Sequence, residues 1–182
     1  MIFNQLFDDK SSTYTYIISS GKGREALIID PVIEHTKKYI KILKDLELKL
    51  VKVIDTHIHA DHISGLNELN KQTECTRVMG EESESEVIDL RVKENEKVKI
   101  EGVELVTLYT PGHTKCSYSY LMNDRVFTGD TLLINGSGRT DFQGGSAMEQ
   151  YDSIFNKLLK LPDKTLVYPA HDYNGKKFST VE

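Results

Sequence analysis

Three histidines and an aspartate lie within six consecutive positions of this 182-residue sequence: His57, His59, Asp61 and His62. Imidazole nitrogens and carboxylate oxygens are the ligands with which proteins bind zinc, iron and manganese. A single histidine is more often an ordinary polar residue, but a group this dense is hard to attribute to chance. The cluster therefore predicts a metal site.

The sequence around the cluster predicts a tight connection between a strand and a helix. Residues 50–54 read as a short buried strand, and Ile63, Leu66 and Leu69 follow the cluster at helical spacing. Loops in this position commonly carry chemistry, because a rigid scaffold holds their ends.

Three more candidate ligands each follow a predicted strand. His113 lies in a Pro-Gly turn after residues 103–109, Asp130 follows residues 125–127, and His171 follows residues 165–168. Because strand ends converge on one edge of a layered fold, we expect these side chains to meet the first cluster in space. The remaining histidine, His35, lies at the start of a helix and receives no role.

Composition and length indicate one globular domain spanning residues 1–182. Hydrophobic residues make up 38% and charged residues 28%, which is ordinary, and the net charge of −5 argues against nucleic acid or an anionic membrane as partner. No apolar run is long enough to span a bilayer, and the first residues enter structure without a signal or transit peptide, so we expect a cytoplasmic protein. Cys75 and Cys116 are too few for a disulfide framework, and we expect both to be small buried hydrophobes.

The pattern along the chain predicts more strands than helices. Helices are expected over residues 34–47, after the histidine cluster, and after a capping box formed by Ser146 and Glu149. The stripe that the last helix should bury consists of Tyr151, Ile154, Phe155, Leu158 and Leu159. Expected strands are residues 3–7, 13–19, 25–30, 50–54, 77–79, 97–100, 103–109, 118–122, 125–127 and 165–168. Helices separate runs of hairpins, which favours an α+β fold with mixed sheets and helices outside.

The pattern H-x-H-x-D-H at residues 57–62, with His113, Asp130 and His171 downstream, resembles the metallo-β-lactamase superfamily. The resemblance covers nearly the whole chain. It implies an αββα sandwich, two mixed β-sheets flanked by helices, with metal bound at one edge of the sheets.

Two further segments resemble one branch of that superfamily, the persulfide dioxygenase (ethylmalonic encephalopathy protein) family. Residues 136–145 read Gly-Ser-Gly-Arg-Thr-Asp-Phe-Gln-Gly-Gly, and residues 168–175 read Tyr-Pro-Ala-His-Asp-Tyr-Asn-Gly. The resemblance implies a sulfur dioxygenase of sulfide oxidation, with O2 and glutathione persulfide, or another low-molecular-weight persulfide, as substrates. The products would be sulfite and glutathione.

Carried over by motif, the resemblance implies one Fe(II) per chain, held by His57, His113 and Asp130. Two imidazoles and one carboxylate are the ligand set of non-haem Fe(II) oxygenases, and they leave positions open for reactants. The substrate-side candidates are Arg139 and Tyr173. Arg139 could instead hold the glycine loop, residues 136–145, in place through Asp141. The residues that would surround the metal and orient its ligands are His59, Asp61, His62 and His171.

Alternatives remain open from the residues alone. The same seven side chains could bind two Zn, Fe or Mn ions, as in a glutathione thioester hydrolase of the glyoxalase II type. The Gly-Arg-Thr-Asp-Phe segment and the lack of a helical C-terminal domain argue against that hydrolase. A non-catalytic metal-binding or thiol-binding module is the third alternative. Members of the dioxygenase family continue beyond the position of Glu182, so their C-terminal segment is expected to be missing, and a homodimer is a further expectation to test.

Overall fold

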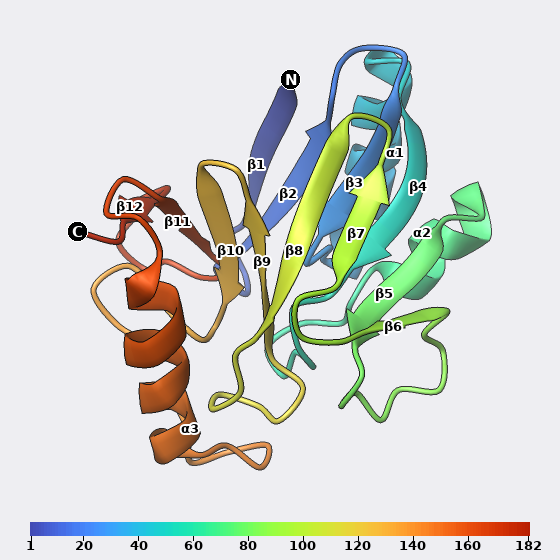
Figure 1. Cartoon of the computed structure of the whole chain (residues 1–182). Helices are drawn as coiled ribbons and strands as arrows, with labels where there is room; N and C mark the ends of the chain where they lie inside the picture. The colour runs from blue at the N-terminus through green and yellow to red at the C-terminus, as the bar shows by residue number, and fades with distance from the viewer.

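The computed structural model describes residues 1–182 and contains two six-stranded sheets stacked face to face, with helices on the outer faces (Figure 1). The first sheet has the order β1-β2-β3-β4-β5-β6. Its strands are β1 (Ile2–Asp8), β2 (Thr13–Ser19), β3 (Glu25–Ile29), β4 (Lys49–Ile54), β5 (Thr76–Gly80) and β6 (Leu90–Val92). The second sheet has the order β12-β11-β10-β9-β8-β7. Its strands are β7 (Lys97–Ile100), β8 (Val103–Tyr109), β9 (Tyr118–Met122), β10 (Arg125–Gly129), β11 (Leu166–Pro169) and β12 (Ser179–Thr180).

Both sheets are mixed, as the sequence pattern predicts. Consecutive strands joined by short turns pair antiparallel, as in β1–β3 and β7–β10. Strands joined across a helix pair parallel: α1 (Thr36–Asp45) lies between β3 and β4, α2 (Leu66–Thr73) between β4 and β5, and α3 (Ala147–Asp152) between β10 and β11. The layers are those of the αββα sandwich.

The main core lies between the two sheets. Strand β2 is buried at every position, because one of its faces packs against the second sheet and the other lies under the helices. A tight aromatic group holds the sheets together, with ring centroids 4.9 Å apart for Tyr16 and Phe127 and 5.0 Å apart for Phe3 and Tyr168. Aromatic pairs at such distances stabilise a core beyond the area that they bury.

Each outer face has its own apolar layer. Helix α1 buries Tyr39 and Leu43 against the first sheet, and Leu158 packs with Val126 and Val167 on the second. Both cysteines are buried and unpaired, as predicted. None of the helices is both long and apolar enough to span a membrane.

The helix after residue 146 differs in part from its prediction. Ser146 Oγ does accept a hydrogen bond from the Glu149 amide at 3.3 Å, so the N-cap is confirmed. The Ser146 amide donates to Gly112 O at 2.8 Å, so the return bond of the predicted capping box does not form. The helix continues from α3 as a π-helical turn (Ser153–Lys157) and a 3₁₀ turn (Leu158–Lys160). Ile154 and Leu158 are buried as expected, but Tyr151 and Phe155 are 60% and 47% exposed. Those two predictions were wrong, because hydrogen bonds from Gln150 and Ser153 turn a different face of the helix toward the protein.

The segment after the histidine cluster is also less helical than predicted. Helix α2 begins only at Leu66, and Ile63 is 67% exposed. The backbone of residues 63–65 instead forms hydrogen bonds with the segment that follows β3, where the Gly65 amide donates to Pro31 O at 2.6 Å. The two short strands β6 and β12 have no counterpart among the predictions.

Candidate metal centre

His57, His113 and Asp130 meet at one end of the sandwich, although they follow three different strands. The Nε2 atoms of His57 and His113 lie 3.9 and 3.5 Å from Asp130 Oδ2, and the two imidazole centroids are 5.0 Å apart. All three side chains are buried or nearly so. Their ligand atoms lie within 4.8 Å of one another, close enough to share one metal ion.

Hydrogen bonds fix the tautomer of both rings. His113 Nδ1 lies 2.7 Å from Arg139 O, which only accepts, so the Nδ1–H donates and the Nε2 lone pair faces Asp130. Thr56 Oγ1 donates to Asp30 Oδ2 at 2.9 Å and can therefore accept from His57 Nδ1, also at 2.9 Å. Metal-binding histidines are typically held in this way through the other ring nitrogen.

The electrostatics of this group fit a bound cation. Burial and the neighbouring imidazoles lower the pKa of His57 well below 6.5, so its ring is neutral and can act as a ligand. Asp130 Oδ1 is buried without a hydrogen-bond partner, and burial raises the pKa of that carboxyl group. A buried carboxylate without partners is costly, and a divalent cation between these three side chains would remove that cost. The residues present therefore fit a metal ion.

The other four predicted residues surround this trio. His59, Asp61 and His62 form a second group whose ligand atoms lie within 4.8 Å. His62 Nδ1 lies 2.8 Å from Asp61 Oδ2, while His62 Nε2 and His59 Nδ1 are buried without partners. His171 lies between the two groups, with Nε2 at 3.7 Å from Asp61 Oδ2 and 3.5 Å from Asp130 Oδ1.

The two sheets join at this edge, which places His171 in the site. The Tyr14 amide at the start of β2 donates to Ala170 O at 2.7 Å, and His171 Nδ1 lies 3.1 Å from Ser12 O. From the same turn, Thr13 Oγ1 donates to Asp61 Oδ2 at 3.0 Å. The β1–β2 hairpin therefore holds a residue of the first motif and a residue of the last one together.

Asp30 lies at the site, and the sequence pattern did not predict it there. It is buried, follows β3 directly and has a left-handed backbone with φ of 49°. Its Oδ1 accepts from the Thr56 amide at 2.7 Å and lies 3.2 Å from His59 Nε2. Burial alone would lower the pKa of His59, but Asp30 and Asp55 raise it to about 9. The signal was available, because Asp30 is a polar residue at a strand end, as Asp130 is.

The glycine loop packs directly against two of the candidate metal ligands, His113 and Asp130. The Gly138 amide donates to Asp130 O at 2.7 Å, and a Cβ on Gly138 would lie 2.4 Å from that oxygen and 2.8 Å from His113 Nδ1. Gln150, also missed from sequence, is buried and donates from Nε2 to Thr131 O at 2.8 Å. The glycine loop and helix α3 thus hold the backbone at Asp130 and Thr131 through hydrogen bonds.

A cavity of about 390 Å³ opens above the site. His113, Asp130 and His171 line it, together with the two substrate-side candidates, Arg139 and Tyr173. The Arg139 guanidinium is mostly exposed and holds Asp141 through two hydrogen bonds of 2.7 and 2.9 Å. The Tyr173 ring lies nearly parallel to His171, with centroids 6.2 Å apart. The volume falls in the range of small-molecule sites.

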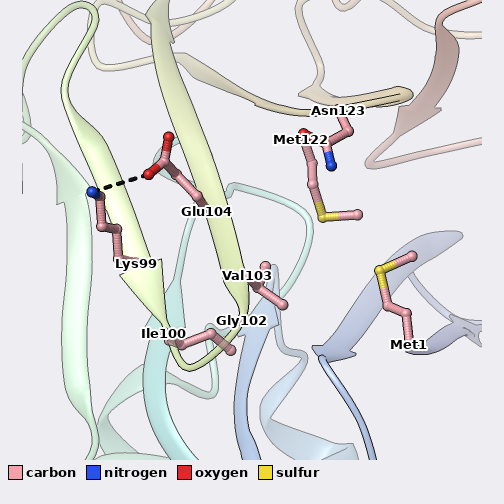
Figure 2. A pocket seen from close by; sticks show the side chains of 8 residues that line it. All are labelled: Met1, Lys99, Ile100, Gly102, Val103, Glu104, Met122 and Asn123. Atoms are coloured by element: carbon pink, nitrogen blue, oxygen red, sulfur yellow. Dashed lines mark ion pairs between the residues drawn. The ribbon is translucent and has the colours of Figure 1, made fainter.

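A second pocket of about 360 Å³ lies at the opposite end of the sandwich, beside the N-terminus and the β7–β8 turn (Figures 1 and 2). Met1 and Met122 face it, and a Lys99–Glu104 ion pair of 3.0 Å lies on its rim. It contains no histidine or cysteine, and its one carboxylate is already paired. The chemistry of the molecule is therefore concentrated at the other end.

Comparisons with known proteins agree with this geometry. Residues 8–171 match the family model of the metallo-beta-lactamase superfamily. The persulfide dioxygenases ETHE1 of Mus musculus and Homo sapiens, both named as mitochondrial, are 42% and 40% identical over the whole chain and 72% of their own length. The crystal structure of ETHE1 from Myxococcus xanthus superposes with a TM-score of 0.97 at 46% identity, over 100% of this chain and 80% of that one. A hydroxyacylglutathione hydrolase of Dictyostelium discoideum is 35% identical over 90% of this chain and 63% of its own length.

The chain belongs to the metallo-β-lactamase superfamily and, within it, to the persulfide dioxygenase family.

Proposed function

We propose that this chain is an Fe(II)-dependent persulfide dioxygenase acting on glutathione persulfide or a related low-molecular-weight persulfide. In the balanced reaction, the persulfide, O2 and water give the free thiol, sulfite and two protons. The outer sulfur is oxidised, O2 is reduced, and the sulfur–sulfur bond breaks. The observation that carries the proposal is the convergence of His57, His113 and Asp130 beneath a cavity of about 390 Å³.

The roles proposed for the metal ligands and for Arg139 follow from their contacts. His57 and His113 would hold the iron through Nε2 because their Nδ1 atoms are engaged elsewhere, and Asp130 would supply the carboxylate. When bound, Fe(II) supplies the redox capacity and open coordination positions that this oxidation needs, which Zn²⁺ would not. Arg139 would attract a substrate carboxylate at the mouth of the cavity.

The remaining residues would orient and tune the site. His171 lies within 4 Å of both Asp61 and Asp130 and can hold or release a proton beside the cavity. Tyr173 lies nearly parallel to that ring and lines the same cavity, where it would contact the substrate. His59 binds Asp30, which turns one of its nitrogens away from the cavity.

The alternative is a thioester hydrolase that binds two metals. His57, His59 and His113 would hold the first metal, and Asp61, His62 and His171 the second, with Asp130 shared between them. The identity of the relatives favours the dioxygenase, because those named persulfide dioxygenase match the whole chain at higher identity than the hydrolase does. A cytoplasmic location is still a prediction for this chain, whose animal relatives are named as mitochondrial.

The test is to measure iron content and oxygen uptake together in two variants. His113→Ala should lose iron and activity in parallel, whereas His171→Ala should keep most of the iron and lose activity. If His171→Ala instead removes about half of a two-metal complement and the protein hydrolyses a glutathione thioester, the hydrolase is correct.

A further inference from the structure

We propose that the turn between β1 and β2 is a positioning device for the reaction, in which the Thr13 hydroxyl holds Asp61 beside His171. This inference rests on the proposed function, and it gives a role to a residue outside the proposed iron ligands. Thr13 is buried, and its Oγ1 donates to Asp61 Oδ2 at 3.0 Å. The same carboxylate oxygen lies 3.7 Å from His171 Nε2, the nitrogen that also faces Asp130.

The backbone of the same turn holds the imidazole. Thr13 and His171 form a β-bridge, and Ser12 O lies 3.1 Å from His171 Nδ1. A carbonyl oxygen only accepts, so the Nδ1–H donates to it and Nε2 is turned toward Asp61. Ser12 has a left-handed backbone with φ of 57°, a conformation that a residue other than glycine keeps where surrounding contacts fix it. One turn therefore fixes both the carboxylate and the imidazole.

Thr13 is itself held by a short chain of hydroxyl and carboxylate groups. Its Oγ1 lies 2.7 Å from Ser11 Oγ, and the Ser11 hydroxyl donates to Asp8 Oδ2 at 2.6 Å. Burial would raise the pKa of Asp8, but Ser11 and His35 lower it to about 2, so the carboxylate is ionised and only accepts. Its other oxygen, Oδ1, lies 2.8 Å from Nε2 of His35, the residue that precedes α1. The chain of contacts thus runs from Asp61 to a second layer of the fold.

The Thr13 hydroxyl is not needed to form the hairpin. Backbone pairing of β1 with β2 already runs from Ile2–Ser19 to Asp8–Thr13, whereas the hydroxyl reaches a carboxylate 48 residues further along the chain. That carboxylate faces His171, the residue proposed above to hold or release a proton beside the cavity. If Asp61 could rotate away, the ring would lose its partner. Thr13 should therefore affect turnover, and not the binding of substrate or iron.

The kinetic test compares Thr13→Val, which removes the hydroxyl and keeps the branched shape, with Thr13→Ser, which keeps the hydroxyl. Thr13→Val should lower kcat about 10- to 100-fold at unchanged KM and iron content, the usual effect of losing a contact that orients a residue beside a metal. Thr13→Ser should restore most of the activity. Ser19→Ala is the matched control and should change nothing, because Ser19 is equally buried at the other end of β2 and donates to Gly21 O at 2.9 Å.

A double variant tests whether Ser11 acts through Thr13. Ser11→Ala alone should lower kcat by less than Thr13→Val does, and S11A/T13V should be no slower than Thr13→Val, because residues in one chain of contacts are not additive. Fully additive losses, or a loss of iron from Thr13→Val, would overturn the proposal.

The geometry can be tested apart from the dioxygenase activity. In protein that contains isotope-labelled histidine and one equivalent of Zn²⁺, Thr13→Val should shift the imidazole N–H signals of His62 and His171 in NMR spectra, because both rings contact Asp61. Ser19→Ala should leave those signals in place. Unshifted signals, or full turnover by Thr13→Val, would contradict the positioning role even in a proven dioxygenase. If the wild type consumes no oxygen, the proposed function fails, and the NMR shifts still decide whether Thr13 holds Asp61.

Discussion

Replacing Gly138 with alanine should weaken metal binding although no predicted ligand is replaced. The new Cβ would lie 2.4 Å from Asp130 O, whereas real Cβ contacts essentially never fall below 3.0 Å, so the loop must move by about 0.6 Å. The same atom would press on His113 Nδ1 at 2.8 Å. A shift of that size stretches the 2.7 Å bond from His113 to Arg139 O beyond ordinary hydrogen-bond length.

The expected magnitude follows from what that bond does. Losing the contact that orients a metal-binding histidine typically costs about 10- to 100-fold in metal affinity or activity. The overpacking itself should lower the free energy of unfolding by about 1–3 kcal/mol. Both effects can be measured, by Fe(II) titration under anaerobic conditions and by denaturant unfolding of the metal-free protein.

Gly136→Ala is the matched control in the same loop. A Cβ there would meet nothing within 4 Å, and the backbone is not in the left-handed region. This variant should bind iron and unfold like the wild type. If Gly138→Ala also binds iron with wild-type affinity, the loop does not position His113.

Three further predictions concern substrate, metal and pH. Arg139→Ala should raise KM at unchanged iron content, because the guanidinium is exposed at the cavity and contacts none of the predicted ligands; a fall in iron content would show that it only holds the loop. Adding Fe(II) at a hundredfold excess over its Kd should stabilise the wild type by about 2.7 kcal/mol, or about 5–10 °C in a thermal melt, and should not stabilise His113→Ala. Burial alone would raise the pKa of Asp8, but hydrogen bonds from Ser11 and the contact with His35 lower it from 3.8 to about 2. Because the folded pKa is the lower one, Asp8 should contribute on the order of 2 kcal/mol above pH 4, and this contribution should disappear as the pH falls through 2. Comparing the unfolding of Asp8→Asn with wild type across that range tests it, and a pH-independent difference would contradict it.

The sequence predicted the parts of the fold that depend on local pattern. Strands β2, β8 and β9 have the expected bounds. Every position of β2 is buried, whereas buried and half-buried positions alternate along most of β8. All seven candidate side chains of the site were also predicted from the sequence. They are polar residues that follow predicted strands, and the ends of these strands meet at one edge. His35, which received no role, contacts Asp8 at 2.8 Å, a contact between two segments that no local pattern encodes.

The failures have a common cause in tertiary contacts. Tyr151 and Phe155 fit a buried stripe by spacing, but Gln150 and Ser153 form the hydrogen bonds that decide which face turns inward. Helix α2 starts late because the backbone of residues 63–65 bonds to residues 31–33 instead of to itself. Asp30 also follows a strand, but its contacts with Thr56 and His59 join segments that are far apart in the sequence.

The most direct test of the central claim is oxygen uptake by the Fe(II)-loaded protein when glutathione persulfide is added, with sulfite assayed in the same sample. One O2 should be consumed for each sulfite formed, and His113→Ala should show no uptake. A wild-type sample that is shown to hold iron, consumes no oxygen and hydrolyses a glutathione thioester would contradict it.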